Sequence, residues 1–418
     1  MAVGGMVGGG IFSTLGVVIG IAGEWAWLSF VGAGLVALGA GYAYTKLASH
    51  YNVTGGAFAY LTEQGLPSFA GSLAWVLIVG YVLTNAVYAF TFGQYLAHVF
   101  GMGQWFARAA AVAILGFFTW LNLRGVGEAG GVEVVLVWFK MAVLVGLAAW
   151  GLSRWQPSLL SRGAPHAGVG AIFFGASSVF MAYEGFQLLA YDVDDIADPR
   201  KTLPRAVLGA IAVVIVTYAL VATGTAMLIG ADQIMAHQEV ALAVAGKEAA
   251  GLAGLIVVTV AAAFSTGSAI NSTLFATARL SHVVAKQRQL PAWIDHQNAR
   301  HMPDRAVIGL GASAAALAVI GTLGILVESA SLAFLATFTV VCALAFRVRA
   351  GHRVFTGIAA LLAFAATIAL AVHLALDDPR PLGALAGLVL VAIFVRPRIL
   401  ALTNGREVSD RSQTQRDQ

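Results

Sequence analysis

The sequence predicts an all-α polytopic membrane protein with about twelve transmembrane helices. Its 418 residues are 59% hydrophobic and 11% charged, and the mean hydropathy is +0.83. Soluble domains carry about 25% charged residues. Apolar runs of about 20 residues, long enough to cross a bilayer as a helix, recur along the whole chain. The alternating segments of about ten residues that a membrane barrel needs do not occur in it.

A window of about 20 apolar residues defines the expected spans. They cover 1–23, 25–48, 67–100, 104–123, 129–152, 168–196, 205–230, 249–284, 305–326, 329–347, 353–376 and 381–396. The third and eighth spans exceed the bilayer thickness, so we expect them to tilt or to extend beyond it.

The distribution of basic residues predicts that both termini are cytoplasmic. With the N-terminus inside, eighteen of the 24 Lys and Arg residues fall on inner segments and five on outer ones, while Lys140 lies within a span. Cytoplasmic loops carry such an excess.

The polar tail, 397–418, is expected to be disordered. Few residues precede the first glycine cluster, so we expect a polar in-frame extension upstream of Met1.

Composition excludes several classes of function. The single cysteine, Cys342, permits neither an intrachain disulfide nor a cysteine metal site. The net charge of +4 belongs to loops, and without a sizeable soluble basic domain it gives no reason to expect nucleic-acid binding. The histidines show no metal-ligand spacing, and neither a cofactor nor a metal is expected.

The first span contains three consecutive glycines, Gly8, Gly9 and Gly10. Glycine costs about 1 kcal/mol relative to alanine within a helix, so three together predict an interruption. Inside a membrane, the freed backbone groups are tolerated only where they meet protein, water or a ligand. Small residues can also simply admit a neighbouring helix, which is the alternative interpretation.

The sixth span contains a second interruption signal, Glu184 followed by Gly185, within an otherwise apolar run. The two signals lie five spans apart, in spans one and six, so these two spans run in opposite directions. Interrupted helices at matching positions of two oppositely oriented halves are typical of inverted-repeat transporters, and they indicate the binding site.

Several motifs resemble the amino acid–polyamine–organocation permeases. These are Gly8-Gly9-Gly10-Ile11-Phe12, Gly55-Gly56-Ala57-Phe58-Ala59-Tyr60, Asn122-Leu123-Arg124-Gly125-Val126, the segment from Phe180 through Pro204, and Arg279 followed by Leu290-Pro291. They cover nearly the whole chain in the family's order. The resemblance implies the fold of the bacterial leucine transporter, with inverted repeats at 1–152 and 168–347, two extra helices within 353–396, and the tail.

The resemblance also implies a substrate site. The carboxylate of an amino acid would dock on backbone N–H groups of Gly8, Gly9, Gly10 and the adjoining Ile11, where a helix terminus carries partial positive charge. Its amino group would meet carbonyls freed between Phe180 and Glu184.

Two ionisable residues, Glu184 and Lys140, lie near the middle of predicted spans. Glu184 could contact a substrate amine or carry a coupling proton, or it could stabilise the broken helix as a buried, hydrogen-bonded carboxyl group. Lys140 lies about 15 Å from the inner end of span five, at ~1.5 Å per residue, and should face the protein interior. It matches the lysine of proton-coupled relatives whose ammonium occupies the second sodium site. A permanently charged structural lysine is the alternative.

Other polar residues give weaker signals. Ser265, Thr266 and Ser268 of span eight could supply hydroxyl groups near Lys140. Asn85 aligns with a pocket asparagine of arginine exchangers, or it packs structurally. Tyr183 is interpreted equally well as packing or as pocket lining, and Gln187 replaces a glutamate found in some polyamine and arginine exchangers. The run Asp192, Asp194 and Asp195 is interpreted as a solvated helix end, or as an inner-gate partner of Arg279 or Lys201.

The sequence therefore predicts a secondary transporter of amino acids or related amines in the cell membrane, working by alternating access with proton symport. Its expected partners are the substrate, a proton and membrane lipid. A proton-independent exchanger is the alternative in mechanism. An embedded enzyme lacks a visible catalytic set, a channel lacks rings of pore-lining charge, and a scaffold would leave Glu184 and Lys140 unexplained.

Overall fold

The computed structural model describes residues 2–53, 55–125, 130–165, 167–191 and 198–396, together with positions 196, 398 and 400. Every regular element within these ranges is helical, as the sequence predicts. The acidic residues Asp192, Asp194 and Asp195 and the tail beyond position 400 lie outside the described residues.

The first half of the chain forms α1 (Ala2–Met6), α2 (Gly10–Ala22), η1 (Gly23–Trp25), α3 (Ala26–Tyr51), α4 (Gly56–Glu63), α5 (Pro67–Phe100), α6 (Gln104–Leu123), α7 (Gly130–Ser153) and α8 (Ser158–Ser161). The second half forms α9 (Ala171–Ser178), η2 (Phe180–Tyr183), η3 (Phe186–Tyr191), α10 (Pro199–Ala236), η5 (Gln238–Val240), α11 (Ala241–Lys286), η6 (Ala292–Asp295), α12 (Asp304–Ile320), α13 (Leu323–Arg347), α14 (Arg353–Leu376), α15 (Arg380–Leu390) and the π-helical turn η7 (Val391–Val395).

Each expected span falls on one helix or on two or three consecutive helical segments. Among the described residues, eight continuous helical stretches are long and apolar enough to cross a membrane, or nine if the bent pair α9 and η2–η3 is counted. One stretch, Gly10–Tyr51, holds two expected spans. The segments α12, with 17 residues, and α15, with 11, are shorter than the ~20 residues that a spanning helix needs. The protein is therefore a polytopic all-α membrane protein.

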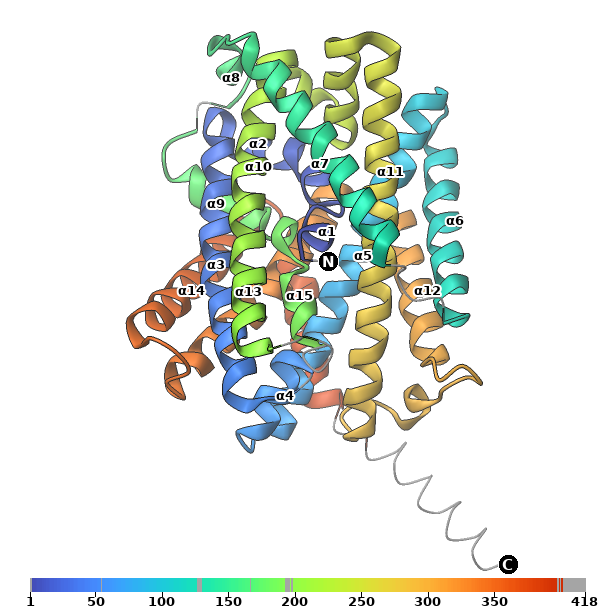
Figure 1. Ribbon diagram of the computed structural model, residues 1–418, viewed down its shortest axis with the longest axis vertical. Coiled ribbons are helices and arrows are strands. Elements are labelled where there is room, and N and C mark those ends of the chain that lie inside the picture. The colour runs from blue at the N-terminus through green and yellow to red at the C-terminus, as the bar shows by residue number, and fades with distance from the viewer. Residues whose placement is uncertain are drawn as a thin grey trace, which may run out of the picture.

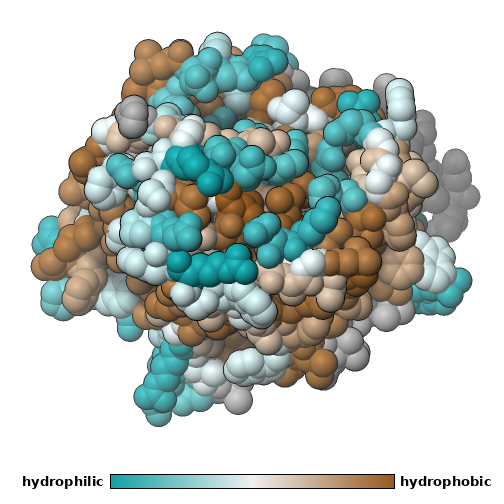
Figure 2. Space-filling model, turned by 90° about the horizontal axis from the view of Figure 1, so that it is seen from above, coloured by the Kyte–Doolittle hydropathy of each residue, from teal (hydrophilic) through white to brown (hydrophobic). Residues whose placement is uncertain are grey.

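Burial separates inner helices from peripheral ones. In their most apolar windows, α5 and α13 are 72% buried, whereas α6 and α14 are 22% buried and present apolar side chains to the surroundings. Figure 1 shows the resulting bundle, with α1 at its centre and α6 and α14 at its flanks. Seen from above, polar side chains gather at one end of the bundle around a patch of apolar ones (Figure 2).

Helix termini follow local sequence signals. Pro67 and Pro199 begin α5 and α10, where a missing N–H group costs no helix hydrogen bond. Gly101 ends α5 in the left-handed conformation. Within α11, Ala250 and Gly251 leave helical geometry, close to the position at which the eighth span is expected to begin.

Candidate functional site

The first helix is interrupted at the glycine cluster. α1 ends at Met6, and α2 begins at Gly10 with Gly9 as its N-cap residue. A Cβ atom on Gly8 would overlap Ala269, and one on Gly9 would overlap the Tyr88 ring. On Gly10 it would lie 2.6 Å from the Tyr218 hydroxyl oxygen. The glycines therefore interrupt the helix and also allow three neighbouring helices to pack closely. Both interpretations of the glycine cluster, interruption and close packing, apply.

The sixth span is also interrupted at the expected residues. η2 ends at Tyr183, Glu184 is extended, and Gly185 has a φ of +123° that disfavours any other residue. A Cβ atom on Gly185 would lie 2.8 Å from the carbonyl carbon of Gly5. The two interrupted helices thus meet glycine to glycine in the middle of the protein.

Side chains from other helices satisfy carbonyl groups freed at the first interruption. The Lys140 ammonium donates to the Gly4 carbonyl oxygen at 2.8 Å, and the Ser265 hydroxyl donates to Val7. Because α7 supplies Lys140 and α11 supplies Ser265, these two helices hold α1 from the side. The sequence predicts that Ser265 supplies a hydroxyl group near Lys140; in the structure both side chains contact the same interrupted helix.

Lys140 is 1% exposed, whereas Trp138 on the same helix is 73% exposed. The ammonium therefore lies in the protein interior and the neighbouring aromatic ring faces outward. This confirms the expected direction of the lysine. The half-buried Ser268 lies one turn beyond Ser265, and the Thr266 hydroxyl bonds Ala262 of its own helix.

One hydroxyl group connects the two interruptions. Tyr218 of α10 lies 2.7 Å from the Met6 carbonyl oxygen and 3.0 Å from that of Ala182. The hydroxyl group has a single proton and donates it to one of these two carbonyl oxygens at a time. The hydrogen bond can therefore switch between the two interrupted helices.

A second hydroxyl group stabilises the bend of the sixth span. Ser331 of α13 donates to the Ser178 carbonyl oxygen at 2.7 Å and accepts from the Met181 N–H group at 3.0 Å. It therefore replaces the helix hydrogen bonds that the bend between α9 and η2 removes.

Glu184 is 1% exposed and already has polar partners. Tyr88 donates to one carboxyl oxygen at 3.3 Å, and Gln187 donates to the other at 3.1 Å. Gln187 is also 3.1 Å from the Tyr81 hydroxyl oxygen. Burial of a carboxyl group is tolerated here because both oxygens accept hydrogen bonds.

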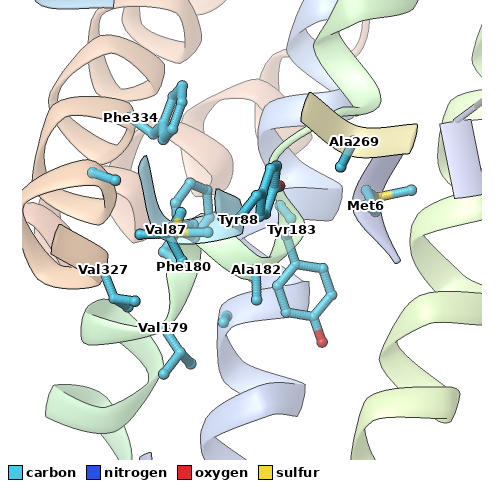
Figure 3. Packing of buried hydrophobic residues seen from close by; sticks show 14 of the residues in the cluster. Met6, Val87, Tyr88, Val179, Phe180, Ala182, Tyr183, Ala269, Val327 and Phe334 are labelled. Atoms are coloured by element: carbon cyan, nitrogen blue, oxygen red, sulfur yellow. The ribbon is translucent and has the colours of Figure 1, made fainter. Parts of the chain in front are cut away.

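The remaining expected residues surround this centre in different ways. Asn85 is 2% exposed and donates to the Tyr81 carbonyl, while its amide oxygen has no hydrogen-bond partner among the described residues. Tyr183 donates to Phe30 of α3 at 2.7 Å. Its hydroxyl points away from Tyr88 (Figure 3). The contact between Tyr183 and α3 favours a packing role.

Phe180 packs edge-on against Phe338 of α13, with ring centroids 5.6 Å apart. Ile11 is fully buried in the first turn of α2. Arg279 lies over the Phe275 ring at 5.6 Å. Its expected acidic partners belong to the undescribed segment, so the inner-gate pairing stays a prediction.

Sequence reasoning missed Tyr88, Tyr218 and Ser331. Tyr88 follows Asn85 by three residues and therefore lies on the same helix face, which is the one signal that pointed to it. Tyr218 and Ser331 lie in apolar spans whose sequences do not show which face turns inward.

The fold and this centre define a polytopic membrane protein with two interrupted helices that meet at a buried polar cluster. The sequence model of the family described as "Amino acid permease" matches residues 1–399. The chain therefore belongs to the amino acid permease family.

Curated relatives agree with this assignment. The chain is 33% identical over 298 residues to the inner membrane transport protein YbaT of Escherichia coli (strain K12), covering 70% of this chain and 68% of that protein. It is 29% identical over 368 residues to cationic amino acid transporter 7, chloroplastic, of Arabidopsis thaliana, covering 82% and 62%. It is 25% identical over 301 residues to the serine/threonine exchanger SteT of Bacillus subtilis (strain 168), covering 70% and 67%.

Proposed function

We propose that this protein is a secondary active transporter of amino acids or related amines, rather than an enzyme, and that it couples uptake to protons by alternating access. Family membership supports the substrate class. The observation that carries the mechanism is the contact between Gly5 and Gly185, because a ligand held by two interrupted helices senses their relative position.

The sequence predicts a carboxylate site on the N–H groups of Gly8, Gly9, Gly10 and Ile11, but the Gly8 N–H group donates to the Gly5 carbonyl oxygen at 3.1 Å. The proposed carboxylate site is therefore the first turn of α2. Its early backbone N–H groups, from Gly9 to Phe12, precede the first intrahelical hydrogen bond, which Ser13 donates to Gly9. The Tyr88 ring lies directly against Gly9, and the Tyr88 hydroxyl bonds Glu184. We infer that a bound substrate displaces this ring and thereby changes the contacts of Glu184.

The proposed coupling site is Lys140. Its buried ammonium contributes a positive charge beside the Gly4 carbonyl oxygen. Loss of the proton weakens this charge-assisted bond and loosens α1 from α7. Glu184 remains the second candidate for the coupling proton, because it is the buried carboxyl group at the other interruption.

A proton-independent exchanger is the second candidate mechanism. A relative named as a serine/threonine exchanger favours it. We further propose that the protein resides in the plasma or inner membrane with both termini in the cytoplasm, on the distribution of basic residues.

A ligand screen tests the proposed function. Purified protein is heated with each standard amino acid and with polyamines, because a ligand that binds the folded state raises its unfolding temperature. Stabilising ligands are then tested for uptake into proteoliposomes with and without an inward proton gradient. We expect at least one amino acid to stabilise the protein and to accumulate. If none of them stabilises the protein or is taken up, the proposal is wrong.

A further inference from the structure

An apolar groove lies between α7 and α11, apart from the substrate site. Its volume is about 160 Å³. The residues that line it include Gly146, Leu147 and Trp150 of α7 and Gly246, Gly254 and Val258 of α11. Figure 1 shows α7 crossing the front of the bundle beside the upper part of α11.

Small residues create this groove. Helix α11 turns at Ala250 and Gly251, so its two arms lie side by side, and a Cβ atom on Gly254 would overlap the Gly246 carbonyl. On the α7 side, a Cβ atom on Gly146 would meet nothing within 4 Å. The close approach of the two arms and the missing side chain of Gly146 together leave the space open.

The groove opens towards the hydrocarbon region of the membrane. Among its neighbours, Val145 is 43% exposed, Val257 44% and Leu252 68%. All three lie on helices long and apolar enough to cross a membrane, so we expect their exposed faces to contact lipid. Trp150, at one end of the groove, is half exposed, as is typical of aromatic residues at a membrane–water interface.

Charged residues lie at that same end. Arg154 follows Trp150 by one helix turn, and its guanidinium lies 3.7 Å from Glu248 of α11. Lys247, next to Glu248, is exposed. These three side chains carry a net charge of +1.

We propose that this groove binds one acyl chain of an anionic phospholipid, whose phosphate group lies against Lys247 and Arg154. The apolar lining suits a hydrocarbon chain, and the basic end suits an anionic headgroup. An entire helix of a second copy, about 10–12 Å across with its side chains, is too wide for this groove.

The groove lies close to the residues that hold α1 in place. Val143, which also lines the groove, is one turn from Lys140, and Val258 is two turns from Ser265 on the same helix. These are the residues by which α7 and α11 hold α1. A chain inserted between the two helices therefore supports the spacing on which those contacts depend.

The test compares phosphatidylglycerol with phosphatidylcholine of identical chains. Native mass spectrometry of the purified full chain measures bound lipid, and thermal unfolding measures stabilisation. We expect phosphatidylglycerol to bind more strongly and to raise the unfolding temperature. The double variant Arg154→Gln, Lys247→Gln should lose that preference, by about five-fold for each basic residue. Lys201→Gln, which changes another exposed lysine, should not.

A second variant blocks the chain site itself. Gly146→Leu fills the groove and should reduce binding of both lipids, whereas Gly116→Leu, also open to 4 Å, should not. Equal binding of both lipids by the parent, or unchanged binding by both groove variants, would overturn the proposal. A dimer that Gly146→Leu dissociates would instead assign the groove to a second copy. These measurements of lipid binding and stability do not depend on substrate transport. Their outcome is therefore independent of whether the proposed function is correct.

Discussion

Gly5, in the last turn of α1, packs against Gly185 at the interruption of the sixth span. A Cβ atom on Gly185 would lie 2.8 Å from the backbone nitrogen of Met6, and one on Gly5 would lie 3.5 Å from the Cα atom of Gly185. Backbone therefore meets backbone at this point. A movement of either helix must be accommodated by the other, and this is why the contact occupies the centre of the proposed mechanism.

Gly185→Ala should destabilise the protein and reduce transport. The new methyl group meets backbone atoms, which cannot yield as a flexible side chain can, and the φ of +123° adds strain. Strain of this kind costs about 1–3 kcal/mol. Thermal unfolding and uptake would measure both effects. Gly209→Ala, at a helical position with nothing within 4 Å, should preserve stability. Equal behaviour of the two variants would contradict the packing described here.

Tyr218→Phe should weaken the connection between the two interruptions. It removes the hydroxyl group that serves Met6 and Ala182, leaving buried carbonyl groups without that donor. An unsatisfied buried group costs ~1–3 kcal/mol, so the unfolding temperature should fall. Thr225→Val on the same helix is the matched control, because the Thr225 hydroxyl is buried with no partner among the described residues. Comparable losses in both variants would show that the Tyr218 hydroxyl has no special role.

Gly9→Leu should abolish amino acid binding while the protein still inserts into the membrane. The added side chain would occupy the space of the Tyr88 ring beside the first turn of α2. Gly20→Leu tests the same change on α2 at a position with nothing within 4 Å. Ligand-induced stabilisation measures binding in both. Retained binding by Gly9→Leu would rule out the glycine cluster as the carboxylate site.

The interruptions could be predicted from the sequence because their causes are local. Three glycines, and a glutamate followed by a glycine, disfavour a continuous helix in any surroundings. The buried position of Lys140 could also be predicted, since its distance from the end of the span leaves no route to the headgroups.

The partners of the freed carbonyl groups could not be predicted in the same way. Tyr218 and Ser331 lie in largely apolar spans without a clear polar face, so the sequence does not indicate how each helix is rotated. Tyr183 shows the same limit, because its contact with Phe30 depends on the packing of α3. The assignment of inverted repeats to 1–152 and 168–347 stays a prediction.

Lys140→Ala gives the most direct test of proton coupling. The variant removes the ammonium from the Gly4 carbonyl, and some loss of stability, ~1–3 kcal/mol, should accompany it. Lys140→Arg should not restore coupling, because arginine stays protonated.

The measurement compares accumulation driven by a pH gradient with substrate exchange in proteoliposomes that hold equal amounts of folded protein. We predict that parent uptake is independent of Na⁺ and rises as the external pH falls. Lys140→Ala should lose gradient-driven accumulation more than it loses exchange. If Lys140→Ala still accumulates substrate as the parent does, the lysine is structural, and Glu184 becomes the leading candidate for the proton site.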